Sequence, residues 1–413
     1  MNIQAKEDPI TVYVSDTQSV DDAYDIIKDC GGTIIIPPGT WEVTKTLAFV
    51  DKSVSIIGSG MGNSILCWTV DVPLGGISMQ GDLEIDNTSL VLENITIKTN
   101  VVNNSGNAVN LIPKDPNQQQ DQGNFPWFRA TNCSFTGDKV YGKGQPPEPN
   151  NKGWNNIIYA KNALRMVITG CYFAGRQDIS PYPDNPSNRA IWIAPNNNGS
   201  FGAENLIDKC VFNWFSHAIY NEGAEGLKIN NCNIVGCYIG LYTNLLSSGG
   251  GNLPCLMLTN SHVHAAYRAV FIENTNGVHI LGNHLYVNDE WELYGGYTGK
   301  SIINTYKCKK VNISDNDLVN HADKTLRMGI ELKECRAGIV SGNLFHNELG
   351  DKFHYYIAFQ DTSYCIARMN THNIGELYFT PLINKLELVP EDDPSDKKHN
   401  MMEDEISEEI LRN

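Results

Sequence analysis

A short pattern that recurs along the 413-residue chain constrains its fold more than any other feature. An apolar-x-apolar pair is followed by small or polar residues, then by Cys, Ser or Asn, and then by x-apolar, as in MVITGCYF, LKINNCNI, VHILGNHL and VNISDNDL. We call the Cys, Ser or Asn the anchor of each repeat. The anchors are Cys133, Cys171, Cys210, Cys232, Ser261, Asn283, Asn316, Asn343 and Asn370. Such self-similarity indicates a repeat architecture.

An apolar residue lies thirteen positions before many anchors and opens a second short strand. These residues are Ile158, Ile219, Val270, Ile303, Ile330 and Ile357. The tightest repeats span 22 residues, which leaves room for three short strands and no helix. Units of this size cannot bury an apolar face alone, but they enclose a continuous core when stacked at the ~4.8 Å spacing of paired strands. The repeat therefore predicts an all-β protein, a parallel β-helix of about a dozen coils with three parallel sheets.

The anchors are expected to stack on one another inside this helix. Asparagine anchors can hydrogen-bond their amide groups from coil to coil, and cysteine anchors can form a small apolar column. The eleven cysteines include no CxxC pair and do not resemble a disulfide framework. We therefore expect reduced, packed thiols, no metal site and no cofactor.

Two end segments differ from the repeats. Residues 19–30 combine an N-capping serine, acidic residues in the first turn and a Gly-Gly stop, which predicts a helix that covers the open edge of the first coil. Residues 386–413 are acidic and are predicted to form a tail. We expect a single β-helix domain over residues 1–385.

The charge of the chain limits its partners. It carries 47 acidic and 31 basic residues, a net charge of -16, which argues against a nucleic acid and against a strongly anionic polysaccharide. No apolar window is long enough for a transmembrane helix, and no secretory signal is visible. We expect a cytoplasmic protein without a membrane partner; a secreted mature form is the alternative.

Aromatic residues recur on one outward face. Side chains alternate across a strand, so the residue after each strand-opening apolar residue points outward. Down the coils this outward column reads Tyr159, Trp192, Tyr220, Tyr242, Phe271, Asn304 and Glu331. We call its five aromatic members the aromatic strip. Stacked rings fit the apolar faces of sugars, which predicts a glycan-binding groove; the alternative is that an inserted loop or a neighbouring subunit of a trimer covers the strip.

Candidate catalytic carboxylates lie two residues further along the same strands. Glu222 and Glu273 flank the strip, two coils or ~9–10 Å apart at the backbone, and glycosidic cleavage needs two carboxyl groups ~5–9.5 Å apart. Glu225, Glu331 and Asp178 are further catalytic candidates; the alternative is that each glutamate is a solvated surface residue. Long insertions at residues 139–156, 174–189 and 286–300 are expected to wall the groove. The predicted substrate-binding residues are the aromatic strip with Asn244, Asn304, Arg189 and Trp291.

The segments GGTIIIPPGTW and SIIGSG and the NxL coils resemble the pectate-lyase-like superfamily of right-handed parallel β-helices over roughly residues 15–380. IIIPPGTWEV, SIIGSGMGNSIL and HAIYNEGAEGLKINNCNIVGC are similar to inulin fructotransferases and difructose-anhydride hydrolases. This resemblance implies a homotrimer that acts on neutral fructans without a cofactor. One family carboxylate falls on Glu225, and the second falls on Gly236, which has no carboxylate.

These observations together predict a carbohydrate-active enzyme of the glycoside hydrolase or fructotransferase type. It is expected to cleave glycosidic bonds of a neutral oligo- or polysaccharide, with fructans among the candidates, by a two-carboxylate mechanism on the outer face of one sheet. The alternatives are a tailspike-like or adhesin-like carbohydrate-binding β-helix and a polysaccharide lyase.

Overall fold

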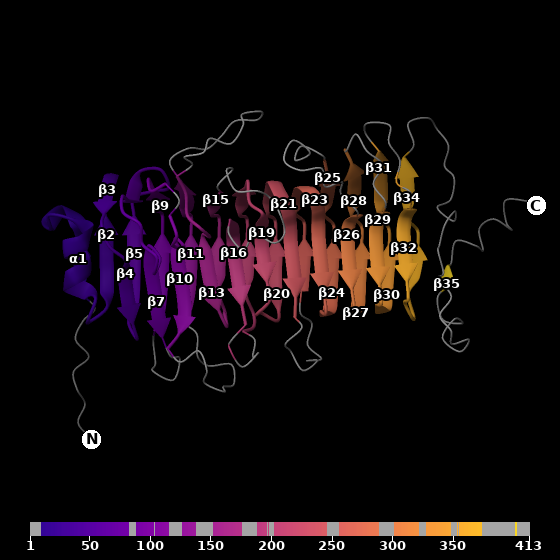
Figure 1. Cartoon of the computed structure of the whole chain (residues 1–413), viewed down its shortest axis with the longest axis horizontal. Coiled ribbons are helices and arrows are strands. Elements are labelled where there is room, and N and C mark those ends of the chain that lie inside the picture. The colour runs from indigo at the N-terminus through magenta and orange to yellow at the C-terminus, as the bar shows by residue number, and fades with distance from the viewer. Residues whose placement is uncertain are drawn as a thin grey trace, which may run out of the picture.

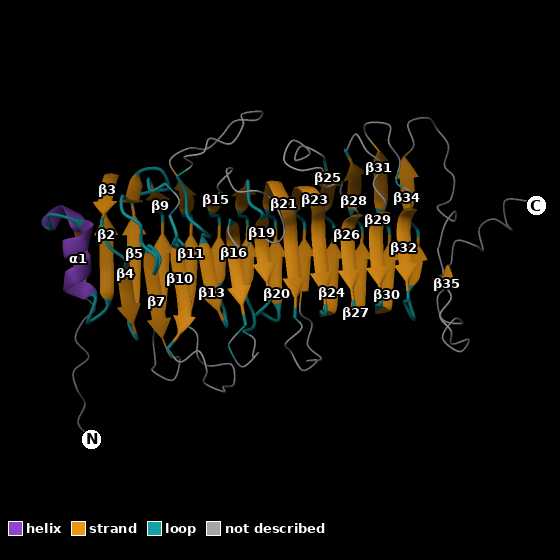
Figure 2. Cartoon of the chain, viewed as in Figure 1, coloured by secondary structure: helices purple, strands orange, loops and turns teal. Residues whose placement is uncertain are grey.

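The computed structural model describes residues 10–81, 88–102, 104–114, 126–137, 152–175, 188–195, 197, 202–245, 256–288, 301–321, 328–347, 353, 355–373 and 401–402. In these residues, short strands follow one another in coils along one axis, and the helix α1 (Val20–Ile27) covers the N-terminal end (Figure 1). Strands make up most of the described chain, as Figure 2 shows. Neighbouring strands pair in parallel from coil to coil, which confirms the predicted parallel β-helix.

One face of the helix is a 14-stranded sheet. Its strands are β1 (Thr11–Tyr13), β2 (Gly32–Ile36), β5 (Ser53–Gly58), β8 (Ser89–Glu93), β11 (Trp127–Thr131), β14 (Val167–Thr169), β17 (Leu206–Asp208), β20 (Leu227–Asn230), β22 (Leu256–Thr259), β24 (Asn276–Leu281), β27 (Lys309–Ser314), β30 (Arg336–Ser341), β33 (Ile366–Arg368) and β35 (Met401–Met402). A short 3₁₀ turn, η1 (Val14–Asp16), precedes α1.

The other two columns of strands belong to one 21-stranded sheet. The first column holds β4 (Leu47–Val50), β7 (Ile77–Gly81), β10 (Val109–Pro113), β13 (Ile158–Lys161), β16 (Arg189–Ala194), β19 (His217–Asn221), β26 (Ser301–Tyr306), β29 (Met328–Lys333) and β32 (Tyr355–Gln360). The second holds β3 (Gly39–Val43), β6 (Ser64–Trp68), β9 (Thr96–Thr99), β12 (Ser134–Gly137), β15 (Tyr172–Ala174), β18 (Val211–Asn213), β25 (His284–Val287), β28 (Asp317–Asn320), β31 (Leu344–Asn347) and β34 (Thr371–Asn373).

Two long strands join these columns. β21 (Asn233–Asn244) and β23 (His262–Glu273) each run through both columns, and their register shifts around Cys237. Gly236 has φ +65°, and a side chain placed there would lie 2.8 Å from the ring of Trp214. Three columns of strands are therefore present, as the predicted three sheets require. Because β21 and β23 continue through the bend between two of these columns, hydrogen bonding joins those two columns into one sheet, and the structure has two sheets in total.

The anchors form one continuous column inside the helix. The backbone N–H of Asn283 and its Nδ2 both donate to Oδ1 of Asn316, at 3.0 and 2.9 Å, while Nδ2 of Asn283 also donates to the carbonyl of Leu258. Asn316 makes the same bonds to Asn343. The column continues to Asn370 in one direction and through Ser261 to the cysteines in the other. Buried amides are thus satisfied from coil to coil, as predicted.

The residue before every anchor explains why the chain can turn so sharply there. Each of these nine residues has a φ between +49° and +66°, in the left-handed region. They are Asn132, Gly170, Lys209, Asn231, Asn260, Gly282, Asp315, Gly342 and Met369. Asn, Asp and Gly enter this region at the lowest cost, which accounts for their frequency at this position.

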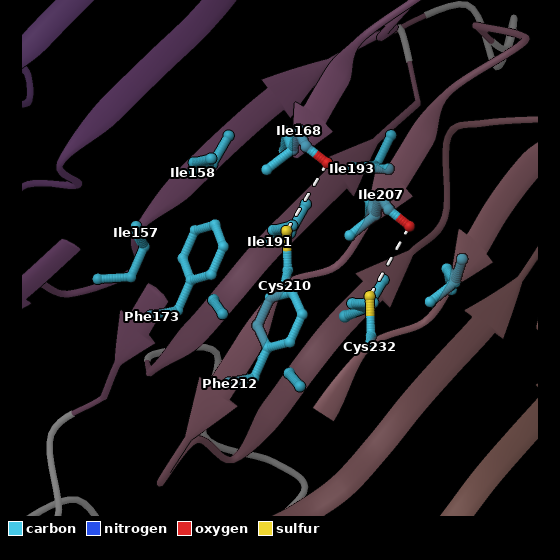
Figure 3. Close-up of a cluster of buried hydrophobic side chains, with 14 of the residues drawn as sticks. Ile157, Ile158, Ile168, Phe173, Ile191, Ile193, Ile207, Cys210, Phe212 and Cys232 are labelled. Carbon is cyan, nitrogen blue, oxygen red and sulfur yellow. Dashed lines mark hydrogen bonds between the residues drawn. The ribbon is translucent and has the colours of Figure 1, made fainter. Parts of the chain in front are cut away.

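The cysteine anchors pack in the apolar core. Cys133, Cys171, Cys210 and Cys232 are buried, and the thiols of Cys210 and Cys232 donate to carbonyls of β14 and β17 (Figure 3). The rings of Phe173 and Phe212 stack beside them, with centroids 4.7 Å apart. All cysteines of the described residues are free thiols, so this column is apolar packing with weak hydrogen bonds.

We expect the buried thiols to react with an alkylating reagent much more slowly than the exposed thiol of Cys30. Hydrogen bonding with the Cys210 thiol and burial raise the pKa of Cys232, and burial raises the pKa of Cys237 to about 12. The reactive thiolate is therefore scarce at these sites. Iodoacetamide should modify the Cys30 peptide of the native protein and reach the anchor peptides only in denaturant, as followed by mass spectrometry. Equal labelling of both in native buffer would contradict the packed column.

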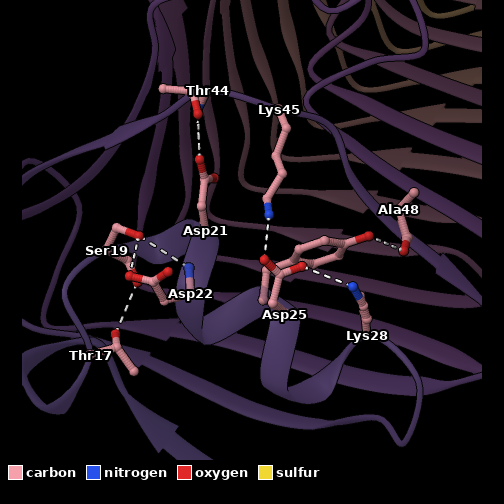
Figure 4. Close-up of polar contacts among 10 residues, drawn as sticks. Thr17, Ser19, Asp21, Asp22, Asp25, Lys28, Thr44, Lys45 and Ala48 are labelled. Atoms are coloured by element: carbon pink, nitrogen blue, oxygen red, sulfur yellow. Dashed lines mark hydrogen bonds and ion pairs between the residues drawn. The ribbon is translucent and has the colours of Figure 1, made fainter.

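The capping helix begins where the sequence predicts and ends earlier. The Asp22 amide donates to the Ser19 side chain at 3.1 Å, and polar bonds from Asp21 and Asp25 tie the helix to the segment around Thr44 and Lys45 (Figure 4). The helix was predicted to reach residue 30, but it stops at Ile27. The cause is Gly31, which has φ +78° and donates its N–H to the carbonyl of Ile27, so the last residues form a turn.

Parts of the predicted organisation lie outside the described residues. In the acidic segment 386–413 the structure describes only β35, and most of the three insertions that were predicted to wall a groove is not described. The single domain over residues 1–385, the tail and the groove stay predictions. No helix of the described part of the chain is long and apolar enough to cross a membrane.

Candidate active site

The aromatic strip lies on the outer face of the first column of strands. Parallel pairing places its members opposite one another in successive coils, in the order Tyr159, Trp192, Tyr220, Tyr242 and Phe271. Successive ring centroids are 4.9, 6.3, 4.6 and 5.3 Å apart. All five side chains are partly buried. The pairing thus brings together five aromatic residues that are distant in the sequence.

Glu222 is held at one edge of the strip by two of its aromatic residues. Nε1 of Trp192 donates to Oε2 of Glu222 at 3.3 Å, and the hydroxyl of Tyr220 donates to Oε1 at 3.1 Å. Burial and the neighbouring Glu222 charge raise the pKa of Tyr220 to about 12, so the phenol remains a donor at neutral pH. Each oxygen of the Glu222 carboxylate therefore accepts one hydrogen bond from the strip.

Glu273 is held in a similar way two coils further on. The hydroxyl of Tyr242 donates to Oε2 at 2.8 Å, and Nδ2 of Asn244 approaches the same oxygen at 3.3 Å. Burial raises the pKa of Tyr242, which keeps its proton on the phenol. Among the described residues no donor bonds Oε1 of Glu273.

The two glutamates occupy one outward row. Asn244 pairs with Glu273, and Asn221 pairs with Thr243, so Glu222 lies one coil before Asn244 and two coils before Glu273. Two strand spacings correspond to ~9–10 Å between the backbones. The two-coil offset is the one that the repeat predicts, and it brings two carboxylates to the same edge of the strip.

A basic row, which sequence reasoning did not find as a unit, lies at the opposite edge of the strip. Arg189 pairs in register with His217, and the same position three coils after Arg189 holds Arg268. The guanidinium of Arg189 lies 3.7 Å from the ring centroid of Tyr220, and that of Arg268 lies 4.2 Å from the centroid of Phe271. Only Arg189 was predicted as a site residue. The signal for Arg268 is its offset of three residues before a strip aromatic, which Arg189 and His217 share.

His217 is an uncharged member of this row. Burial, with the nearby Arg189 charge, lowers its pKa to about 3, so the imidazole is neutral at physiological pH. Its ring lies 5.0 Å from that of Tyr220. The strip thus runs between a row with two cations and a row with two carboxylates.

The remaining predicted site residues are placed less favourably or lie outside the described residues. Glu331 continues the strip column after Asn304, which donates its Nδ2 to the glutamate, and both side chains are buried. Glu225 lies in the turn after β19, where burial raises its pKa. Asp178 and Trp291 fall outside the described residues.

A histidine cluster lies on the outer face of the second column. His284 contacts Asp317 at 2.8 Å and His346 contacts the same carboxylate at 3.0 Å, while the ring of Tyr286 stacks on His264. The register of β23, β25, β28 and β31 brings these side chains together from four successive strands of the column. In the described part of the chain, no group of three or more His, Cys, Asp or Glu is arranged to hold a metal ion.

Comparisons with known proteins identify the fold. No protein-family model and no curated protein matches the chain. Among solved structures, it is similar to the DFA-IIIase of Arthrobacter chlorophenolicus A6 in complex with GF2, with a TM-score of 0.55 and 12% identity over 89% of this chain and 92% of that one. The mannuronan C-5 epimerase AlgE4 A-module of Azotobacter vinelandii has a TM-score of 0.48 and 14% identity over 87% and 90% of the two chains. The Dettilon tailspike protein has a TM-score of 0.43 and 12% identity over 88% and 62%.

The chain is a right-handed parallel β-helix, as the resemblance to the pectate-lyase-like superfamily implied. At 12% identity, the likeness to the DFA-IIIase establishes this fold and leaves the activity to be argued from the site.

Proposed function

We propose that the protein is an enzyme that cleaves glycosidic bonds of an oligo- or polysaccharide bound along the aromatic strip. Glu222 and Glu273 are the reacting carboxyl groups in this proposal. The observation that carries it is the direct link between binding and chemistry: a tyrosine of the strip hydrogen-bonds each glutamate, Tyr220 to Glu222 and Tyr242 to Glu273. A sugar that packs on these rings has its glycosidic oxygens beside both carboxylates.

We further propose a single-displacement reaction, because the strands that carry the two glutamates are ~9–10 Å apart at the backbone. In inverting glycosidases the carboxyl groups are about 6.5–9.5 Å apart, which leaves room for the attacking nucleophile, whereas retaining enzymes hold them at about 5 Å. Two coils separate Glu222 from Glu273. One carboxylic acid protonates the leaving oxygen while the other carboxylate accepts a proton from the attacking hydroxyl. That hydroxyl belongs to water in a hydrolase or to the substrate itself in a fructotransferase-type reaction.

A screen of glycans with product analysis tests this proposal. Fructans are the first substrates to examine because the solved DFA-IIIase was crystallised with GF2 and shares the fold. We expect chain shortening or a cyclic product, with inversion at the anomeric carbon visible by NMR. An adhesin-like or tailspike-like protein would bind a glycan and release no product, and a lyase would generate an unsaturated sugar end that absorbs in the ultraviolet.

Removing single rings tests whether the strip binds the glycan. Trp192→Ala and Tyr242→Ala are each expected to weaken oligosaccharide binding by at least about tenfold, because each removes a partly buried ring of the strip. Trp127→Ala is the matched control, since this exposed tryptophan lies on β11 in the other sheet. Affinity is measured by calorimetry beside the melting temperature.

Two results would contradict this assignment. Unchanged affinity in both variants would place the glycan elsewhere. A large loss of melting temperature, with a change in oligomeric state by sedimentation, would show instead that the strip packs against a neighbouring subunit, as in the predicted homotrimer.

A further inference from the structure

Two buried arginines of the basic row have hydrogen-bond donors that no group among the described residues accepts. Arg189 is only 5% exposed and Arg268 only 8%. Nε and Nη1 of Arg189 and Nε of Arg268 are buried and have no hydrogen-bond partner in the part of the chain that the structure describes. Their positions are equivalent, because both precede a ring of the strip by three residues and pack on its face.

The nearby carboxylates do not satisfy these donors. The Glu222 charge acts on Arg189 through space, but both oxygens of Glu222 accept from Trp192 and Tyr220 instead. Glu273 accepts from the tyrosine and asparagine beside it. A buried guanidinium without an acceptor is costly, and burial lowers the pKa of Arg189 accordingly. Cation–π contact with the rings offsets part of this cost and leaves the N–H groups unused.

An arginine held in this way is prepared for an anionic ligand group. The guanidinium donates through a planar fork that matches a carboxylate or a sulfate, and aromatic rings on its face fix its position without using its hydrogen bonds. Arg189 and Arg268 are three coils apart, about 14 Å along the helix. One acidic group cannot bridge that distance, whereas an oligosaccharide with several acidic groups along the strip can contact both.

We propose that Arg189 and Arg268 bind acidic groups of the glycan, so that the substrate is an oligosaccharide with carboxylate or sulfate groups. This inference rests on the proposed function for the position of the glycan on the strip. It departs from the expectation of a neutral glycan, which was based on the net charge of the chain. The register of β16 and β23 adds a second cation, Arg268, to the predicted Arg189 beside the strip.

Binding measurements on matched oligosaccharides test the proposal. The probes are cello-, mannan- and inulin-oligosaccharides, each compared with a C6-oxidised or O-sulfated counterpart of the same length; oxidised and sulfated forms distinguish the two anionic groups. We expect the acidic member of at least one pair to bind at least about tenfold more tightly than its neutral counterpart. Arg189→Leu is expected to abolish this preference, and Arg189→Lys to retain only part of it, since lysine keeps the charge and loses the planar fork.

The control variant is Arg165→Leu, which removes the same charge from an exposed arginine whose partner is Glu204. It should retain the preference for the acidic glycan. Melting curves with sulfate or acetate add a readout that needs no glycan: these anions should stabilise the wild type more than Arg189→Leu. Equal affinity for acidic and neutral members, a preference that survives in Arg189→Leu, or the absence of binding by every acidic glycan and both anions would overturn the proposal.

The arginine subsites and the proposed enzymatic activity can fail independently of each other. Selective binding of an acidic glycan without cleavage would refute the catalytic role of the glutamates and retain the arginine subsites. Cleavage of a neutral glycan with no preference for its acidic counterpart would retain the enzyme and refute the subsites.

Discussion

Replacing Glu222 or Glu273 by glutamine is expected to lower the rate of glycan cleavage by at least about a hundredfold, because positioned general acids and bases contribute on the order of 10²–10⁴ to such reactions. Glutamine keeps the size of the side chain and an oxygen that can accept from Tyr220 or Tyr242. It cannot donate or accept the catalytic proton. Initial rates on the glycan identified by the screen measure the effect, and binding of the same glycan should change little.

The controls for this experiment are other glutamates of the chain. Glu334→Gln alters a glutamate that pairs with Lys307 away from the strip, and it should leave the rate unchanged. Glu225→Gln and Glu331→Gln test the other two candidates that the structure describes. Full activity of both Glu222→Gln and Glu273→Gln would refute their assignment, and a large loss in Glu225→Gln alone would transfer the catalytic role to the turn after β19.

Replacing Asn316 by alanine is expected to destabilise the protein by about 3 kcal/mol or more, the largest stability effect that we predict. Its side chain accepts from the amide and Nδ2 of Asn283 and donates to Asn343 and to the carbonyl of Ile280. Alanine leaves these partners buried without their bonds, and each unsatisfied buried group costs about 1–3 kcal/mol.

Urea denaturation gives the free energy of unfolding, and hydrogen exchange locates the change. Since each coil contacts only its neighbours, amide protection should fall most in β24, β27 and β30, around the missing side chain. Asn233→Ala is the control because Asn233 is exposed and its side chain bonds only the ring of His262 among described residues. A loss at Asn316 no greater than that at Asn233 would show that the column of anchors contributes little to stability.

The repeat predicts the coil architecture well because a residue inside a β-helix meets the same residue of the next coil. Insertions lengthen the intervals between Asn283, Asn316 and Asn343, but the residues around each anchor keep the same pattern. The column of anchors could therefore be predicted from the sequence. The merging of two columns through β21 and β23 could not be predicted. It depends on a bulge near Gly236, where the backbone packs against Trp214.

The sequence predicts which residues follow one another in the aromatic strip, but not all the residues that lie beside the strip or their hydrogen bonds. One alternation rule places Tyr220, Tyr242 and Phe271 in one column, and Glu222 and Glu273 follow two residues later. The hydrogen bonds of the glutamates depend on side-chain rotamers, which a pattern does not contain. Arg268 was not predicted because the row that it shares with Arg189 also contains His217 and Ile239, so no single residue type identifies this row in the sequence.

The most direct test of the account is a crystal structure of the Glu222→Gln variant with a bound oligosaccharide from the glycan screen. We predict sugar rings packed on Trp192, Tyr220 and Tyr242, with one glycosidic oxygen within hydrogen-bond distance of residue 222 and the adjacent anomeric carbon facing Oε1 of Glu273. A glycan bound on another face of the helix, or a strip filled by a neighbouring subunit, would contradict the central claim that this row of aromatic residues and glutamates is the active site.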